Sequence, residues 1–230
     1  ELGHGFATKI WGGAVHEMGL MFLVFAPVPY VDASSSSTFP SKYQRAIVGA
    51  AGMMAELLIA SLAMYIWLLI EPGIVRTVAY NIMLIAGIST LIVNGNPLLR
   101  YDGYYILCDL IEIPNLGQRG NAYLTYLSDR YIFKARELES PQESPSEKRW
   151  LVSYTILAWF YRIIVAATIA LFIAEQFFIF GVLLGILSAF QLICLPVWKS
   201  VKHILSSPTL RRQRAWAIKL SLSLTTATLL

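Results

Sequence analysis

Long, nearly uninterrupted runs of apolar residues dominate this sequence of 230 residues. A helix of about 20 apolar residues crosses the hydrocarbon core of a membrane. Four runs are long enough and predict membrane-spanning helices: residues 46–70, 73–93, 150–174 and 177–198. A fifth run, residues 215–230, predicts the start of another spanning helix. Because the chain starts with Glu1 and this run stops at Leu230, we expect it to be part of a longer protein.

Two further apolar segments are unsuited to a clean span. Tyr104–Ile113 has ten residues, about 15 Å as a helix and roughly half of a hydrocarbon core. We expect it to dip into the membrane and to be shielded by neighbouring helices. The segment from His16 to Asp32 is interrupted by glycine, Pro27 and Pro29, which favours a re-entrant or edge element. The predicted fold class is an all-α polytopic membrane protein with a re-entrant element and additional C-terminal spanning helices.

The composition agrees with a membrane protein. Hydrophobic residues make up 57% and charged residues 14%, against about 25% charged residues in soluble domains, and the mean hydropathy is +0.60. The net charge of +4 is concentrated in loops, where basic residues determine membrane topology. We therefore expect the lipid bilayer, and no nucleic acid, as a partner.

The loops between the runs divide the chain into successive parts. The first part is a membrane-embedded core, and it is followed by a charged, Pro- and Ser-rich loop that we expect in the cytoplasm. A transmembrane hairpin with a tight turn at Glu175 and Gln176 comes next, and a basic cytoplasmic loop follows it. The predicted boundaries of these parts are 1–117, 118–149, 150–198, 199–214 and 215–230.

The first residues, E-L-G-H, form most of a zinc-binding pattern. In H-E-x-x-H, two histidines four residues apart on a helix bind one zinc ion, and the glutamate deprotonates the water that the metal activates. Glu1 and His4 match the glutamate and the second histidine. On these residues alone, an ordinary polar pair at a helix end is the simpler interpretation.

A second candidate ligand lies in the segment N-G-N-P-L-L-R-Y-D-G. Asp102 stands at the start of the short apolar helix, where an ionisable residue is costly and marks a functional candidate. Pro97 cannot continue the preceding helix, and Gly103 permits a close backbone approach. Two histidines and one carboxylate would leave a zinc position open for water, as in catalytic sites. Two further acids of this helix are expected to be solvated or paired with Arg100 or Arg119: Asp109 and Glu112.

These two motifs and the apolar core between them resemble the site-2 protease family of intramembrane zinc metalloproteases. Members carry H-E-x-x-H on one helix and N-P-x-x-x-x-D-G on another, and this chain fills every defined position of the second motif, with Asn96, Pro97, Asp102 and Gly103. The resemblance covers about the first half of the chain. It implies a site-2-protease-like helical core with Zn²⁺ held by His4 and Asp102, and Glu1 as general base. It also implies a histidine directly before Glu1, without which the printed chain is expected to be inactive.

Three longer stretches resemble the branch of peptide zinc metalloproteases within this family: GLMFLVFAPVPYVDASSSSTF, QRAIVGAAGMMAELLIA and NGNPLLRYDGYYILCD. Members of that branch often continue into a periplasmic adaptor domain like those of peptide and toxin exporters. The resemblance implies a bacterial inner-membrane endopeptidase that cleaves a peptide or membrane-protein substrate. The alternative is a non-catalytic membrane subunit of an export system, which anchors such an adaptor domain. A metal-ion transporter fits poorly, because the spans carry few polar positions.

One position departs from the family pattern. Where many members have G-P-x-x-N, this chain has G-M-M-A-E, so that Glu56 replaces an asparagine that helps to position substrate or oxyanion. A buried Glu56 is either adjacent to the site or a structural hydrogen-bond partner. Asn94 and Asn96 can donate to a developing oxyanion, but turn formation explains them equally well. His16 begins a second His-Glu pair, but Leu20 occupies the position of the second histidine, so a metal role is not expected.

Overall fold

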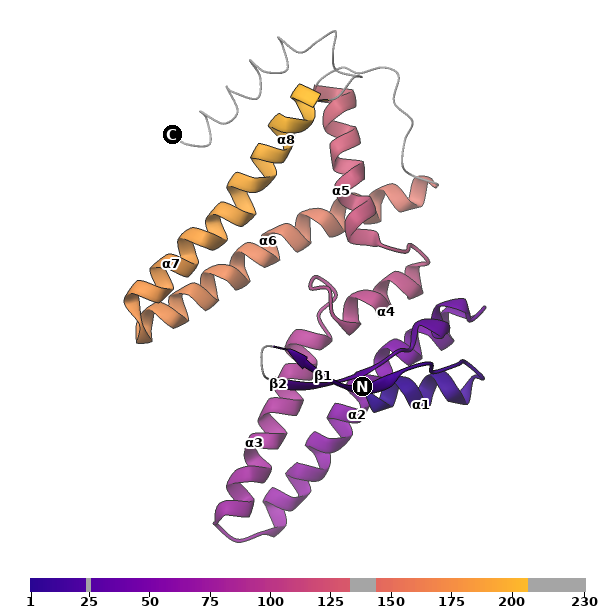
Figure 1. The fold of residues 1–230 in the computed structure, drawn as a ribbon, viewed down its shortest axis with the longest axis vertical. Coiled ribbons are helices and arrows are strands. Elements are labelled where there is room, and N and C mark those ends of the chain that lie inside the picture. The colour runs from indigo at the N-terminus through magenta and orange to yellow at the C-terminus, as the bar shows by residue number, and fades with distance from the viewer. Residues whose placement is uncertain (24–25, 133–143, 207–230) are drawn as a thin grey trace. The chain divides into compact units, whose positions relative to one another are not determined.

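The structure is a computed structural model that describes residues 1–23, 26–132 and 144–206. Most of these residues are helical (Figure 1), and the chain forms two compact units, Glu1–Pro114 and Asn115–Leu230. The predicted fifth span and the second half of the predicted basic loop lie outside the described residues.

The first unit is built on a long helical hairpin (Figure 1). Helices α2 and α3 are joined by the turn E-P-G, where Pro72 and Gly73 interrupt the helical pattern. The last turn of this second arm is a π-helical segment, Ser89–Asn94. The elements of the unit are α1 (Leu2–Ile10), β1 (Met18–Leu23), β2 (Ala26–Val31), a 3₁₀ turn (Ser34–Thr38), α2 (Lys42–Leu69), α3 (Ile74–Ile88) and α4 (Asp102–Ile111).

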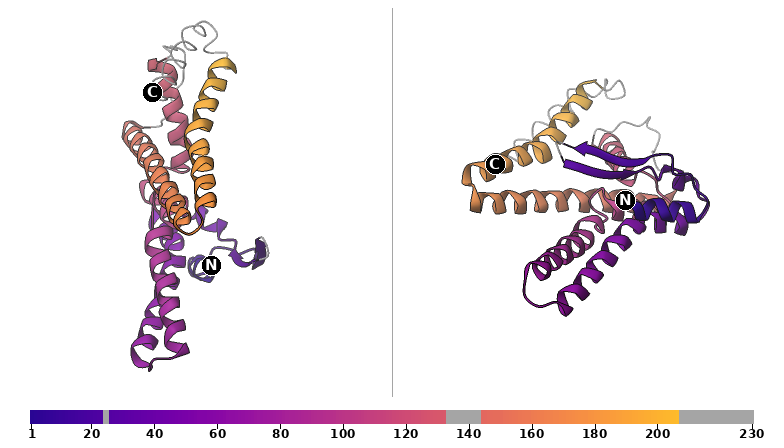
Figure 2. Two further views of the ribbon diagram at one scale, coloured as in Figure 1. Left: turned by 90° about the vertical axis from the view of Figure 1, so that its left-hand side faces the viewer. Right: turned by 60° about the horizontal axis from the view of Figure 1, so that its bottom comes forward.

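The segment between His16 and Asp32, for which a re-entrant or edge element is expected, forms an antiparallel β-hairpin (Figure 2, right). Met18 pairs with Val31, and Leu20 pairs with Pro29. Proline breaks a helix but is accommodated in a strand with a free edge, and both strands of a two-stranded sheet have one. The first unit is therefore not purely α-helical, and the predicted fold class is corrected at this segment.

The second unit contains a hairpin of two long helical arms (Figure 1). Its elements are α5 (Leu116–Leu127), a π-helical segment (Ser128–Ile132), α6 (Pro145–Gln176), α7 (Phe178–Ala189), a second π-helical segment (Phe190–Cys194) and α8 (Leu195–Ser206). Only Phe177 separates α6 from α7, so the expected tight turn is present and follows directly on Glu175 and Gln176, the last two residues of α6. At this turn Gly181 packs so closely on Ala174 that no side chain would fit.

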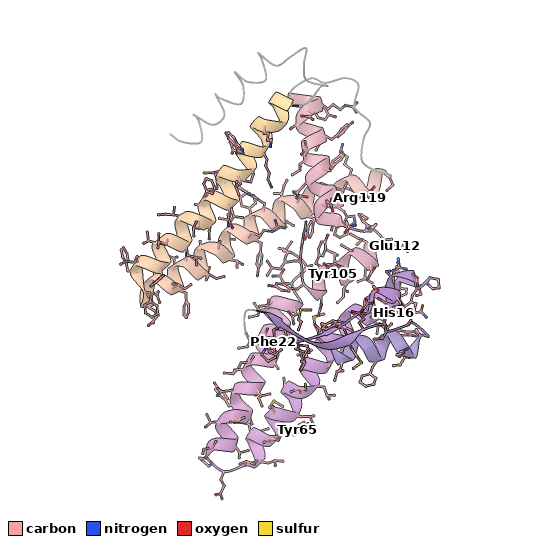
Figure 3. The ribbon with its side chains drawn as sticks, in the orientation of Figure 1. His16, Phe22, Tyr65, Tyr105, Glu112 and Arg119 are labelled. Atoms are coloured by element: carbon pink, nitrogen blue, oxygen red, sulfur yellow. The ribbon has the colours of Figure 1, made fainter. Side chains whose placement is uncertain are left out.

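Helix α5 begins within the predicted core and continues into the predicted loop 118–149. Its sequence is only weakly apolar, but Leu116, Tyr123 and Tyr126 are buried. Arg119 on α5 (labelled in Figure 3) forms an ion pair with Glu147 near the start of α6, with an N···O distance of 2.5 Å. Packing against α6 therefore stabilises α5, although its own sequence has only a weak apolar pattern.

Among the described residues, four helical segments are long and apolar enough to cross a membrane: Lys42–Leu69, Ile74–Asn94, Ser146–Gln176 and Phe178–Lys199. Each begins within a few residues of a run predicted from the sequence. Most of their large apolar side chains are exposed, as expected where lipid is the solvent. The prediction of a mainly helical membrane protein is confirmed to this extent.

Candidate metal centre

Helix α2 is the scaffold on which the candidate site is assembled. Val48, Gly52 and Glu56 follow one another at intervals of four residues and therefore lie along one face. Helix α1 packs on this face closely enough that a Cβ atom on Gly3 would overlap the carbonyl oxygen of Ala51. The imidazole of His4 occupies the space above Gly52, where any side chain would collide with it.

The orientation of His4 is set by a backbone carbonyl. Its Nδ1 atom lies 2.7 Å from the carbonyl oxygen of Val48. Because a carbonyl oxygen only accepts, Nδ1 carries a proton and donates it, so that in the neutral ring the lone pair is on Nε2. Metal-binding histidines are held in this way, with the second ring nitrogen bonded to a carbonyl or carboxylate. The Nε2 atom is thus prepared to bind a cation.

Helix α4 brings Asp102 to the same place by running antiparallel to α2. Three contacts show this direction, because the residue numbers fall along α2 while they rise along α4. The contacts are Gly49 with Ile106, Arg45 with Asp109 at 3.3 Å, and Lys42 with Glu112 at 3.7 Å. Glu112 ends this series at the C-terminal end of α4 (Figure 3). One helical turn before Ile106, towards the start of α4, Asp102 therefore lies at the level of Gly52 and beside His4.

The N-P-x-x-x-x-D-G segment supports this placement through its backbone. The side-chain oxygen of Asn96 accepts a hydrogen bond from the N–H of Leu98 at 2.9 Å and so stabilises the turn after α3. A Cβ atom on Gly103 would lie 2.5 Å from the carbonyl oxygen of Gly95, so the expected close backbone approach is present. Asn96 is therefore used in turn formation.

His4 and Asp102 are brought together although they are far apart in the sequence. The Nε2 atom of His4 lies 3.7 Å from Oδ2 of Asp102, and the two side chains are 16% and 32% exposed. Two ligands about 2.0–2.2 Å from a tetrahedral zinc ion are separated by about 3.4 Å. The pair therefore fits zinc after a small adjustment. Among the described residues, no group of three His, Cys, Asp or Glu side chains is arranged to hold a metal ion.

The charges around Asp102 also point to a cation. Asp102 lies outside the four candidate spans, and burial raises the pKa of its carboxyl, whereas His4 acts in the opposite direction. Glu1 and Glu56 raise this pKa further by repulsion, so both carboxylates lie within electrostatic range. Glu1 itself is exposed at the start of α1, and its side chain does not cap the helix. A bound cation would relieve this accumulation of negative charge.

Glu56 forms a polar cluster with the π-helical segment that follows α3. Its carboxylate accepts hydrogen bonds from the hydroxyl of Thr90 and from Nδ2 of Asn94, the latter at 3.1 Å. Thr90 is only 1% exposed. Glu56 is thus a structural hydrogen-bond partner, one of its two sequence interpretations, and its interpretation as a site residue stays a prediction. Asn94 is engaged by Glu56, a contact that sequence reasoning missed.

Other polar residues considered from the sequence lie elsewhere. His16 is exposed in the irregular segment before β1 (Figure 3), so its His-Glu pair is not on a helix. Asp109 and Glu112 pair with Arg45 and Lys42, so the expected partners, Arg100 and Arg119, were wrong. Burial raises the pKa of Asp109, and the Arg45 guanidinium opposes this effect.

Comparison with protein-family models, with curated proteins and with solved structures finds no match for this chain. The function must therefore be argued from the site itself.

Replacement of Gly52 by alanine is expected to displace His4, because the new methyl group would occupy the position of its imidazole. Overpacking of this kind costs about 1–3 kcal/mol, and zinc affinity should fall with it. Gly87→Ala in α3 is the matched control, since its Cβ would meet only Ala60, at 3.9 Å. Thermal unfolding and zinc titration of the full-length protein in detergent would compare the two. Equal zinc affinity in both variants would contradict the proposed position of His4.

Proposed function

We propose that this chain is the membrane core of an intramembrane zinc endopeptidase of the bacterial inner membrane, acting on a peptide or membrane-protein substrate. The observation that carries the proposal is the pairing of His4 and Asp102 on one face of α2. These side chains supply an imidazole nitrogen and a carboxylate oxygen, two of the usual ligands of catalytic zinc.

The proposal needs a third protein ligand, which the family resemblance places directly before Glu1. A residue at that position lies four positions before His4 and, on a continued helix, projects from the same side of α1. It would complete a set of two histidines and one carboxylate. Such a set leaves one position of a tetrahedral metal open to water or substrate.

The residues around the pair have distinct roles in peptide hydrolysis. Zinc, when bound, supplies Lewis-acid chemistry, polarising the scissile carbonyl and making a water molecule more acidic. The carboxylate of Glu1 takes the proton from the attacking water and later delivers it to the leaving amine. Val48 holds His4 in the required tautomer through its carbonyl oxygen. Glu56 and Asn94 form a polar wall beside the site that can orient the substrate backbone.

Zinc content of the full-length protein, purified in detergent, tests the proposal. We expect about one zinc ion per chain, measured by inductively coupled plasma mass spectrometry after removal of loosely bound metal. A metal-free preparation that takes up no added zinc would contradict the peptidase proposal. The alternative, a membrane subunit that anchors the adaptor domain of an export system, would then be favoured.

A further inference from the structure

Arg162 is an unusual residue in the second unit. It stands inside the predicted span 150–174, which contains no Asp or Glu. Among the described residues, no ion pair or hydrogen bond of its side chain is found. A charged residue inside an apolar span is costly and is by default a candidate for function.

Arg162 lines a cavity of about 400 Å³ between α5 and α6. The lining is amphipathic: Arg162 and Asn121 are polar, and Leu124, Trp159 and Phe160 are apolar or aromatic. None of the described residues that line the cavity is acidic. The indole N–H of Trp159 donates to the carbonyl of Leu192 at 3.3 Å, which holds that wall in place. The cavity therefore offers a cation and an amide donor next to an apolar surface.

The position of Arg162 along α6 suits a lipid headgroup. A 30 Å hydrocarbon core corresponds to about 20 helical residues. Counted back from the end of α6 at Gln176, this core would begin near residue 157. Arg162 would then lie about 8 Å below the surface, and a long arginine side chain reaches the interface from such a depth. Lys148 and Arg149 precede it at the same end, which the basic-loop rule assigns to the cytoplasm.

We propose that the cavity between α5 and α6 binds the phosphate headgroup of an anionic phospholipid, with its acyl chains along the apolar wall. Arg162 forms a charge-assisted hydrogen bond to the phosphate, and Asn121 donates to the same group or to the headgroup hydroxyls. Basic cavities at the cytoplasmic side of spanning helices bind anionic lipids in this way. This proposal does not depend on the peptidase function.

The test uses the full-length protein reconstituted in nanodiscs of equal parts phosphatidylglycerol and phosphatidylcholine. After extraction, native mass spectrometry counts the retained lipids. The wild type is expected to retain phosphatidylglycerol preferentially, and Arg162→Met to reduce this retention by about five- to tenfold. Arg76→Met is the matched control, because Arg76 also lies in a candidate span but stacks on Trp67 at 5.0 Å in the other unit. It should retain lipid like the wild type.

A second variant protects the test against misfolding. Asn121 is exposed at the cavity, so Asn121→Phe should narrow the cavity, keep Arg162 and still lower phosphatidylglycerol retention. Unchanged retention in both Arg162→Met and Asn121→Phe would overturn the proposal, as would an equal loss in Arg76→Met. Complete displacement of the lipid by millimolar inorganic phosphate would assign the cavity to a free phosphate instead and would also overturn it.

Discussion

Replacement of Asp102 by asparagine is expected to remove zinc from the full-length protein while leaving the fold intact. Asparagine keeps the shape of the side chain but loses the negative charge that draws a cation towards Nε2 of His4, 3.7 Å away. Even the loss of a group that only supports a metal ligand lowers affinity about 10–100-fold, so the loss of a ligand should cost more than about 100-fold. Zinc titration against a competing chelator, in detergent, measures the change.

The chain offers two close controls for this experiment. Asp109 lies on the same helix but pairs with Arg45, so Asp109→Asn should retain zinc although it also removes a carboxylate. His16 is exposed and outside the site, so His16→Ala should behave like the wild type. Wild-type zinc affinity in Asp102→Asn would remove Asp102 from the ligand set and contradict the proposed centre.

The spans were predictable from the sequence because lipid imposes a simple rule on them. Most residues of a helix such as α2 must be apolar over a length set by the bilayer, whatever its neighbours are. The β-hairpin at Met18–Val31 was not predicted, since its prolines and glycine exclude a helix without identifying a strand. Helix α5 was missed for a related reason: its stability comes from packing on α6 and not from its own pattern.

The candidate site could be predicted only as far as its sequence motifs extend. Glu1, His4 and Asp102 were candidates from the sequence because a ligand type and its spacing are properties of the sequence, and their zinc site stays a prediction. The partner of Asp109 was not, because Arg45 becomes its neighbour only when α4 packs antiparallel on α2. The same holds for Glu56, whose contacts with Thr90 and Asn94 depend on the π-helical turn at the end of α3. Contacts between side chains of different helices can be predicted only when the packing of those helices is known.

Replacement of Glu1 by glutamine is expected to abolish peptide cleavage while zinc binding is retained. Glutamine has the same shape but cannot accept the proton of the attacking water, and loss of a general base lowers the rate about 10²–10⁴-fold. Cleavage is measured as new peptide termini in native membranes that contain the full-length wild-type or variant protein.

Glu17→Gln is the matched control, because Glu17 also follows a histidine but is exposed before β1, and it should cleave like the wild type. If the protein contains zinc, the zinc content does not distinguish a peptidase from a metal-binding membrane anchor, and this pair of variants does. A zinc-loaded wild type that releases no termini beyond those of Glu1→Gln would indicate a metal-binding membrane anchor. If Glu1→Gln cleaves like the wild type, the peptidase proposal would stand, and the proton transfer would be assigned to a group other than Glu1. Because Glu56 is the other carboxylate within electrostatic range of Asp102, it would be the next residue to replace.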